Sequence, residues 1–385
     1  MNLVPTLHRI IVVGNGIAGL TASDTLRESG FDGELIVIGD EPRDAYSRPA
    51  LSKAALGELG EMTAHLLPPP EHGAETFLGV HVTGLDAGAS ELVLSDGQRM
   101  SFDGLVIATG IRPRKLRPDL DIEMTFRHVD DALTLRDRLV ARPRVVVIGA
   151  GVLGMELASS CRAAGCDVAV VSRRKPLVAF FGDYLADIFV AAATNHGITW
   201  ESPEAVDLRA TESKNFVILS DGREIEADLV ISAIGDVPNT EWLAESGLLT
   251  DGELAVDSRG RVRPNIVAAG DVAAIDTPHG RRRVPLWTSA IEQSKTAARG
   301  LLLGDDAEPL AFQPYFWTDQ FGLSLKACGE LPVRGTPGFT EGDASANALL
   351  LRWQNVDGTG TAVALNYRIP VPKLRALSRQ APVAS

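Results

Sequence analysis

The motif Gly-x-Gly-x-x-Gly occurs twice in this chain, at residues 14–19 and 149–154. Each copy directly follows an apolar run, 9–13 or 144–148, and precedes a segment with a helical pattern. In that context the first glycine permits a tight turn, the second lets the backbone approach a pyrophosphate, and the third packs helix against strand. The N-terminus of the following helix then stabilises the negative charge of the pyrophosphate. The duplication predicts two dinucleotide-binding folds.

The first fold is expected to continue through a helix over about 17–29 and a second strand over 34–38. Asp40 and Glu41 follow that strand. An acid ~20 residues beyond the glycine motif accepts hydrogen bonds from an adenosine ribose, although the spacing does not separate these two residues. A strand at 105–108, followed by Thr109 and Gly110, is expected to return the chain to this site.

The second fold is expected to contain strands 144–148 and 167–171 and to return through an apolar segment, 227–235, that ends in Gly235. A further apolar strand, 265–271, carries Asp271 at its end. Beyond Pro309 the sequence changes to alternating strands with aromatic residues, which predicts a third, smaller domain.

The end of the strand 167–171 carries no acid but the basic turn Ser172-Arg173-Arg174-Lys175. A carboxylate there would bind a ribose 2′-hydroxyl and repel a 2′-phosphate. A hydroxyl and arginines offer a phosphate a hydrogen bond and charge-assisted contacts. We therefore expect NADPH to be preferred over NADH, the alternative being a basic turn that only tolerates NADH.

Composition is typical of a multidomain enzyme. A chain of 385 residues with 45% hydrophobic residues is expected to form roughly two to three domains. The sequence shows no signal peptide and no apolar span of ~18 residues, so a cytoplasmic protein without a membrane partner is expected. The net charge of −13 disfavours nucleic acid. The spacing of Cys161, Cys166 and Cys328 fits neither a metal site nor a disulfide framework, so we expect reduced, structural thiols and no bound metal.

The order of the motifs resembles that of the FAD-dependent ferredoxin reductases of oxygenase electron-transfer chains, the putidaredoxin reductase-like family. Any one motif would also fit the wider glutathione reductase-like superfamily. The segment 46–53, YSRPALSK, is more specific, because disulfide reductases have their redox cysteines in this part of the chain and here there is none. The segment 315–322, YFWTDQFG, resembles the family's small C-terminal domain. The resemblance extends over essentially the full length.

The resemblance implies an α/β fold with two nested, glutathione reductase-like dinucleotide-binding domains and a small α+β C-terminal domain. The FAD-binding domain would be discontinuous, because the nicotinamide domain is inserted into it. The expected boundaries are 1–113 and 243–309 for the FAD-binding domain, 114–242 for the NAD(P)H-binding domain and 310–385 for the C-terminal domain.

The resemblance also implies roles for individual residues. Asp271 would hydrogen-bond the ribityl chain of FAD, Val82 would contact the adenine and Trp287 the isoalloxazine edge. On sequence alone Val82 and Trp287 also fit plain core positions, and Arg127 a surface charge. The full set of expected cofactor-binding residues is Gly14, Asn15, Gly16, Ala18, Gly19, Asp40, Glu41, Arg48, Lys53, Val82, Ala108, Thr109, Gly110, Arg127, Gly270, Asp271, Trp287 and Trp317, with Gly149, Gly151, Val152, Leu153, Gly154, Glu156, Ser172, Arg173, Arg174 and Gly235.

Lys53 and Glu156 are the expected catalytic pair, since the resemblance implies that they face each other beside the flavin. A cation there stabilises negative charge on the reduced flavin, and a carboxylate orients the lysine. Hydride transfer needs no nucleophile, so the lack of a Ser-His-Asp or Cys-His pattern is no objection.

The expected function is a ferredoxin reductase (EC 1.18.1.-) that passes electrons from NADPH through FAD to an acidic iron–sulfur ferredoxin, which supplies a cytochrome P450 or a Rieske oxygenase. Two alternatives stay open: a different acceptor, as in a rubredoxin, disulfide or persulfide reductase, or a non-catalytic redox-sensing flavoprotein resembling the apoptosis-inducing flavoproteins. Three basic clusters are candidate ferredoxin contacts: Arg112, Arg114, Lys115 and Arg117; Arg281, Arg282 and Arg283; and Arg368, Lys373, Arg375 and Arg379.

Overall fold

The computed structural model describes residues 7–53, 67, 70–212, 214–311, 313–354 and 359–379. The chain divides into two compact units, each assembled from separate stretches of sequence. The first unit holds Met1–Ser47, Thr63–Arg112 and Val237–Phe312, and the second holds Arg48–Met62, Pro113–Asp236 and Gln313–Ser385.

A six-stranded sheet forms the centre of the first unit, in the order β19-β20-β7-β1-β2-β3. Apart from β19, which is antiparallel to β20, its strands run parallel. The four inner strands, β1, β2, β7 and β20, are nearly continuous apolar runs, as expected for strands covered on both faces of the sheet. The strands are β1 (Arg9–Val13), β2 (Glu34–Gly39), β3 (Glu75–Leu78), β7 (Gly104–Ile107), β19 (Arg261–Arg263) and β20 (Ile266–Ala268).

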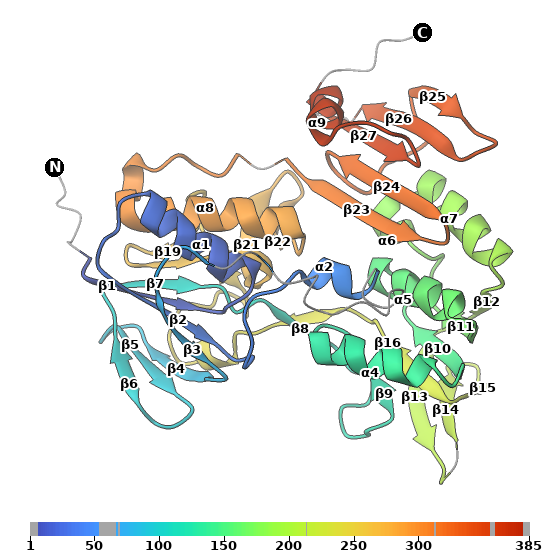
Figure 1. Ribbon diagram of the computed structural model, residues 1–385, viewed down its shortest axis with the longest axis horizontal. Coiled ribbons are helices and arrows are strands. Elements are labelled where there is room, and N and C mark those ends of the chain that lie inside the picture. The colour runs from blue at the N-terminus through green and yellow to red at the C-terminus, as the bar shows by residue number, and fades with distance from the viewer. Residues whose placement is uncertain are drawn as a thin grey trace. The chain divides into compact units, whose positions relative to one another are not determined.

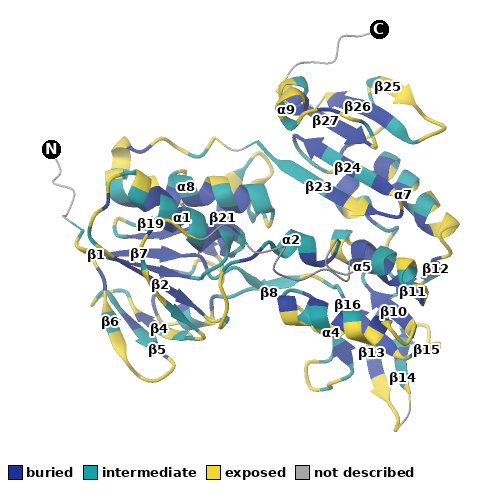
Figure 2. Ribbon diagram, in the orientation of Figure 1, coloured by how far each residue is buried: buried dark blue, intermediate teal, exposed yellow. Residues whose placement is uncertain are grey.

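Alternate residues of β1 contribute to two separate cores. Ile10 and Val12 pack with residues of helices α1 (Ile17–Glu28) and α8 (Trp287–Leu303), which lie together in Figure 1. Ile11 and Val13 pack on the other face against the small sheet β4-β5-β6 and the segments around β18 and β21. Figure 2 shows the central strands as the most buried part of this unit.

The second unit contains the second parallel sheet, ordered β12-β11-β10-β16-β9. One face packs against the antiparallel sheet β13-β14-β15, and α5 (Val152–Ala163) contacts β10 and β11. The strands are β9 (Glu123–Met124), β10 (Arg144–Ile148), β11 (Asp167–Val171), β12 (Thr199–Glu201), β13 (Ala205–Ala210), β14 (Asn215–Leu219), β15 (Glu224–Ala227) and β16 (Leu229–Ser232).

An antiparallel sheet ordered β23-β24-β27-β26-β25 completes the second unit, with α9 packed on β27. Its first strand, β23, contacts α5, and Phe316 of β23 lies edge-on to Phe180 and Phe181 of α6. The C-terminal sheet is therefore packed against the fold that contains the second parallel sheet. The elements are β23 (Tyr315–Gln320), β24 (Leu323–Cys328), β25 (Phe339–Asp343), β26 (Ala348–Gln354), β27 (Gly360–Leu365) and α9 (Val371–Arg379).

The remaining elements connect these layers. They are α2 (Arg48–Leu51), β4 (Val82–Asp86), β5 (Glu91–Leu94), β6 (Arg99–Ser101), β8 (Ile111–Pro113), α4 (Val129–Leu139), α6 (Val178–Phe181), α7 (Asp183–Asn195), β17 (Asp236–Pro238), β18 (Leu254–Ala255), β21 (Ala273–Thr277) and β22 (Gly280–Arg283), with short 3-10 turns at Glu241–Leu243, Gly270–Val272 and Gly304–Asp306.

The predicted α/β fold with two dinucleotide-binding sheets is confirmed, and the expected strands 9–13, 144–148 and 167–171 have the predicted bounds. The segment expected over 265–271 is shorter as a strand, because Gly270 has φ +81° and begins a 3-10 turn. The expected return through 227–235 likewise keeps only Leu229–Ser232 as its parallel strand. The domain boundaries expected from the resemblance remain a prediction.

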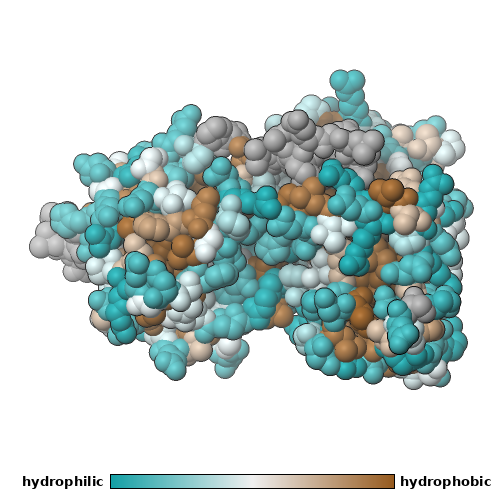
Figure 3. All heavy atoms as spheres, turned by 60° about the horizontal axis from the view of Figure 1, so that its bottom comes forward, coloured by the Kyte–Doolittle hydropathy of each residue, from teal (hydrophilic) through white to brown (hydrophobic). Residues whose placement is uncertain are grey.

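Within the described ranges, no helix is long and apolar enough to cross a membrane. Hydrophilic residues cover much of the face drawn in Figure 3, with hydrophobic residues in smaller groups between them. The same described residues contain no group of three or more His, Cys, Asp or Glu side chains that could hold a metal ion.

Candidate functional site

The first glycine of each motif makes the same close approach in both folds. Gly14 has φ +115° and Gly149 has φ +102°, values that favour glycine. A Cβ atom would lie 2.2 Å from the carbonyl oxygen of Ala108 at Gly14, and 2.3 Å from that of Ala233 at Gly149. Each turn therefore packs against the chain that leaves the neighbouring strand, β7 beside β1 and β16 beside β10.

The third glycine of each motif lets the helix approach the turn. A Cβ at Gly19 would lie 1.8 Å from the oxygen of Gly14, and one at Gly154 would lie 2.0 Å from the oxygen of Gly149. No side chain fits at either position, because backbone atoms occupy the space.

The second glycines, Gly16 and Gly151, have open space instead, since a Cβ there would meet nothing within 4 Å. Each is the N-cap of its helix, α1 or α5, and being glycine it has no side chain to accept hydrogen bonds from the backbone N–H groups of the first turn. Neither first turn contains an acidic residue. Both helix N-termini therefore fit the pyrophosphate of a dinucleotide, a group that FAD and the nicotinamide coenzymes share.

The end of β2 lies beside the first glycine loop, because a Cβ at Gly39 would come within 2.8 Å of the Asn15 Cβ. Asp40 is exposed there. Glu41 accepts a hydrogen bond of 2.6 Å from the hydroxyl of Tyr46. The carboxylate of Asp40 is thus the more open of the two for a ribose contact, and the assignment of either residue remains a prediction.

Gly270 brings the late strand β20 to the same loop. A Cβ at Gly270 would lie 2.9 Å from the Ala18 Cβ, and its N–H donates 3.1 Å to Oε1 of buried Gln293. Asp271 follows directly, and Trp287 begins α8. Sequence reasoning missed Gln293, since a glutamine inside a helix carries no local signal for a partner 23 residues earlier.

The loop after β7 is held by a second residue that the sequence did not reveal. The Thr109 hydroxyl donates 2.9 Å to the carbonyl oxygen of Asn239, whose amide donates 2.9 Å to the carbonyl oxygen of Thr109. The Asn239 N–H also donates to the carbonyl oxygen of Gly110 at 3.0 Å. This reciprocal pairing fixes the loop that packs against Gly14.

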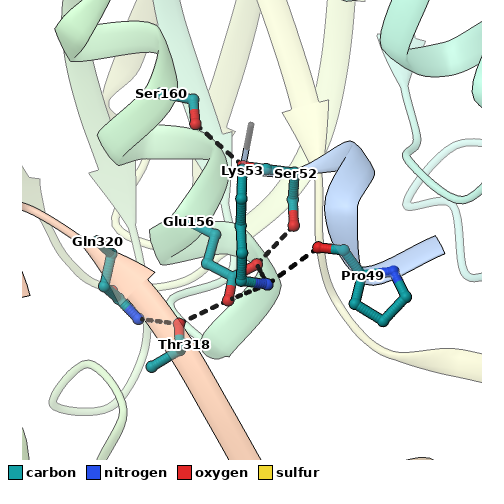
Figure 4. A network of polar contacts seen from close by, with 7 residues as sticks. All are labelled: Pro49, Ser52, Lys53, Glu156, Ser160, Thr318 and Gln320. Atoms are coloured by element: carbon teal, nitrogen blue, oxygen red, sulfur yellow. Dashed lines mark hydrogen bonds and ion pairs between the residues drawn. The ribbon is translucent and has the colours of Figure 1, made fainter. Parts of the chain in front are cut away.

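The second unit brings Lys53 and Glu156 together. The Lys53 Nζ lies 2.9 Å from Oε1 and 3.0 Å from Oε2 of Glu156, and it also donates 3.1 Å to the carbonyl oxygen of Pro49 (Figure 4). The exposed fractions of the two side chains are 14% and 4%, so the pair is largely shielded from water. Shielding strengthens its electrostatic interaction compared with a surface pair.

Glu156 receives two further hydrogen bonds, from residues that sequence reasoning did not select. The Ser52 hydroxyl donates to Oε2 and the Thr318 hydroxyl to Oε1, each at 2.5 Å. Ser160 donates 3.0 Å to the carbonyl oxygen of Ser52, which holds the end of α2 against α5. Polar Thr318 and Gln320 alternate along β23, a pattern that indicates a polar contact on that strand face without identifying the partner.

Arg48 and Arg127 are also brought together, although by a backbone contact. The Arg48 guanidinium donates 3.1 Å to the carbonyl oxygen of Arg127, and it lies 3.2 Å from Nδ1 of His128. Trp317 stacks on Tyr315, on the strand face opposite to Thr318. Val82 packs against the core of the first unit. The cofactor contacts expected for Arg48, Arg127, Trp317 and Val82 remain predictions.

Backbone hydrogen bonds make the turns after β2 and β11 directly comparable. The Gly14 N–H donates to the carbonyl oxygen of Ile38, and the Gly149 N–H donates to that of Val171. Ile38 and Val171 are therefore equivalent. It follows that Asp40 and Glu41 of the first fold occupy the positions of Arg173 and Arg174 in the second.

The basic turn is not uniform. Lys175 pairs with Asp187 at 2.7 Å and with Asp183 at 3.1 Å, contacts that raise the pKa of its ammonium. The Ser172 hydroxyl donates 2.8 Å to the carbonyl oxygen of Arg174. Arg173 and Arg174 are exposed and form no ion pair with any residue that the structure describes.

Three other predicted site residues lie near the second glycine loop. Val152 begins the adjoining helix, Leu153 is partly exposed, and Gly235 follows β16 with φ +104°.

All three cysteines are buried, free thiols, as expected for structural residues. Burial raises the pKa of Cys161 to about 12 and that of Cys328 to about 11, and it also raises the pKa of Cys166. Thiols in such surroundings are poor nucleophiles at neutral pH. They provide no disulfide relay beside Lys53.

Two dinucleotide loops with matching geometry and a shielded Lys–Glu pair define a class of flavin- and nicotinamide-dependent oxidoreductases. Comparison with known proteins agrees. Residues 8–294 match the family described as pyridine nucleotide-disulphide oxidoreductase. The ferredoxin--NAD(+) reductase component of the p-cumate 2,3-dioxygenase system of Pseudomonas putida is 30% identical over 84% of this chain and 82% of its own length.

Solved structures lead to the same group. The ferredoxin reductase for the CYP199A2 system of Rhodopseudomonas palustris matches with a TM-score of 0.83 and 28% identity, over 94% of this chain and 91% of that chain. The covalent putidaredoxin reductase-putidaredoxin complex matches with a TM-score of 0.85 and 25% identity, over 98% and 94%. The chain belongs to the pyridine nucleotide-disulphide oxidoreductase family, and the predicted resemblance to its ferredoxin reductases is confirmed.

Proposed function

We propose that this protein is an FAD-dependent reductase that passes electrons from a nicotinamide coenzyme to an iron–sulfur ferredoxin of an oxygenase system. The observation that carries the proposal is the glycine loop of closely similar geometry in two folds of one chain. Such a chain can hold one dinucleotide as a resident cofactor and receive a second as substrate. The ferredoxin acceptor follows from the names of the relatives, which are ferredoxin reductases of P450 and dioxygenase systems.

Residues of the first unit would hold FAD. The open N-terminus of α1 at Gly16 would bind the pyrophosphate, Asp40 or Glu41 the adenosine ribose, and Asp271 the ribityl chain. When bound, FAD accepts a hydride from the nicotinamide and releases its electrons one at a time to a one-electron carrier. We retain the predicted division into FAD-binding, nicotinamide-binding and C-terminal domains as part of this proposal.

We assign Lys53 the role of supplying a fixed positive charge to the reaction, and Glu156 the role of orienting it. The assignment is supported by the bidentate contact between the two side chains and by their burial. A charge already in place before the reaction needs no rearrangement when negative charge develops.

We further propose that NADPH is the preferred coenzyme. Arg173 and Arg174 lie where the first fold has two acids, and neither is occupied by a carboxylate among the described residues. Exposed guanidinium groups at this corner suit a 2′-phosphate. The relatives are named for NAD(+), so this preference would distinguish the chain from them.

The function is tested by electron transfer to cytochrome c. With purified protein and NADPH, rapid cytochrome c reduction is expected only after an iron–sulfur ferredoxin is added, whereas ferricyanide is reduced without it. Slow flavin reduction with a persistent long-wavelength absorbance, and no ferredoxin-dependent turnover across a panel of ferredoxins, would instead support a redox-sensing flavoprotein.

Replacing Lys53 with Ala should slow flavin reduction by NADPH about 100-fold and change the Kd for NADPH much less, because its charge acts mainly as the reaction proceeds. Stopped-flow absorbance at a series of NADPH concentrations separates the two quantities. Lys295→Ala, which removes an exposed lysine of α8, is the matched control and should react at the wild-type rate. Reduction of the Lys53→Ala protein at the wild-type rate would remove this residue from the mechanism.

The three basic clusters differ in how far their charges are already paired. Arg112 pairs with Glu241, Arg117 pairs with Asp119 and Asp207, and Arg281 pairs with Asp276, whereas Arg114 and Lys115 are exposed and form no ion pair with a described residue. The α9 cluster consists of Arg368, Lys373, Arg375 and Arg379, and none of the four forms an ion pair with a described residue. Arg368, Lys373 and Arg379 are exposed. Arg375 lies over the ring of Tyr315. We therefore propose the α9 cluster as the contact for an acidic ferredoxin.

Neutralising Lys373 and Arg379 together, as Lys373→Gln/Arg379→Gln, should raise the KM for ferredoxin about 5-fold and flatten its dependence on salt, since exposed charges contribute modestly. Ferricyanide reduction should be unchanged. Arg112→Gln/Arg281→Gln removes two charges that are already paired and is the matched control. Wild-type ferredoxin kinetics in both double variants would contradict electrostatic docking at α9.

A further inference from the structure

Two polar side chains of β23 extend the Lys53–Glu156 pair into the C-terminal sheet. The Thr318 hydroxyl lies 2.5 Å from Glu156 Oε1, and Gln320 Nε2 lies 3.1 Å from the Thr318 hydroxyl oxygen (Figure 4). Thr318 is fully buried and Gln320 is 3% exposed. These contacts connect residues 162 positions apart in the sequence.

The direction of these hydrogen bonds is determined by the number of protons available. An ionised Glu156 has none to donate, so the single hydroxyl proton of Thr318 must point to Glu156 Oε1. The Thr318 oxygen can then act only as an acceptor toward Gln320. The Gln320 amide donates into it and so holds the hydroxyl in the orientation that Glu156 requires.

The buried position of Gln320 is not explained by a gain in folding stability. Its Oε1 is buried without a hydrogen-bond partner among the described residues, an arrangement that opposes folding. An apolar residue of similar length would avoid that unfavourable burial. The glutamine is therefore better explained by its contact with Thr318 than by packing.

We infer that Thr318 and Gln320 are positioning residues for hydride transfer: Gln320 orients the Thr318 hydroxyl, which holds the Glu156 carboxylate against the Lys53 ammonium. This inference rests on the proposed role of Lys53. It gives the C-terminal sheet a part in the reaction, since β23 supplies the hydroxyl donor to Glu156 Oε1 while Ser52 supplies the one to Oε2.

Three variants of the FAD-loaded protein test the arrangement. Thr318→Val keeps the shape of the side chain and loses the hydroxyl, Thr318→Ser keeps the hydroxyl, and Gln320→Leu removes the orienting amide. Thr318→Val and Gln320→Leu should slow flavin reduction by NADPH about 5- to 20-fold, because the carboxylate that orients Lys53 is held less firmly, with the Kd for NADPH unchanged. Thr318→Ser should react within about 2-fold of the wild-type rate.

A second measurement does not depend on turnover. Trace labelling of lysines with acetic anhydride, followed by peptide mass spectrometry, reports how firmly Lys53 is held. Labelling of Lys53 should increase about 3-fold or more in Thr318→Val and Gln320→Leu but not in Thr318→Ser, while labelling of Lys295 stays constant. Gln320→Leu should unfold at the wild-type temperature or above it.

A double-variant cycle separates this inference from the proposed function. If Thr318 acts through Lys53, adding Thr318→Val to Lys53→Ala should change the rate by less than about 2-fold. If the Lys53→Ala protein is slow but the Thr318→Val protein has wild-type kinetics and wild-type labelling of Lys53, the inference is overturned and the proposed role of Lys53 stands. An equal loss from Thr318→Val in both backgrounds, or a Thr318→Ser protein as slow as Thr318→Val, also overturns it. A wild-type rate in Lys53→Ala contradicts the proposed role of Lys53 itself.

Discussion

Replacing Arg173 with Asp and Arg174 with Glu should reverse the coenzyme preference from NADPH to NADH. The change gives the second fold the acid pair that the first fold has at the equivalent positions, Asp40 and Glu41. It removes charge-assisted contacts to a 2′-phosphate and introduces repulsion, so the ratio of kcat/KM for NADPH to that for NADH should fall by about 100-fold or more. Steady-state ferricyanide reduction with each coenzyme measures this ratio.

Lys175→Met is the matched control for that experiment, because it removes a cation of the same turn that Asp183 and Asp187 already pair with. Its effect on the ratio should stay below about 3-fold. The reading of this corner would be overturned by a wild-type protein that prefers NADH, or by an unchanged ratio in the charge-reversed protein.

Replacing Gly154 with Ala should strongly destabilise the second unit. The added Cβ would lie 2.0 Å from the carbonyl oxygen of Gly149, and no flexible side chain can yield there. Backbone must move instead, so we expect the free energy of unfolding to fall by about 3 kcal/mol or more. Guanidinium denaturation followed by circular dichroism measures the change.

Gly151→Ala is the control within the same loop, since its Cβ would meet nothing within 4 Å. The backbone at this N-cap, with φ −76°, accepts alanine, and stability should change by less than about 1 kcal/mol. The methyl group should nevertheless raise the Kd for NADPH while FAD content stays constant. Equal stability of the Gly154→Ala and Gly151→Ala proteins would show that the close approach at Gly154 is not required.

The two dinucleotide-binding folds could be predicted because their signals are local. An apolar run of about five residues, a glycine turn and a helical segment are adjacent in sequence, and each requirement applies within a few residues. The bounds of β1, β10 and β11 therefore agree with the prediction. Strand 265–271 was predicted too long, because hydropathy does not register the turn that Gly270 makes against Ala18.

The contacts of single polar side chains depended on the tertiary structure. In the sequence, Lys175 and Arg173 are both simply cations of the same turn. Only the packing of α7 beside the turn pairs Lys175 with Asp183 and Asp187. Asn239 likewise follows no motif, and its role emerges when the chain returns to Thr109.

The amino-acid sequence by itself determined the class of fold, the two glycine loops and the choice of Lys53 and Glu156, the last through resemblance. Only the tertiary structure decided what surrounds that pair. Ser52, Glu156 and Thr318 come from three distant segments, and a buried carboxylate can be satisfied by hydroxyl donors from any part of the chain. Local pattern cannot specify such partners, because long-range packing of α2, α5 and β23 brings them within hydrogen-bonding distance.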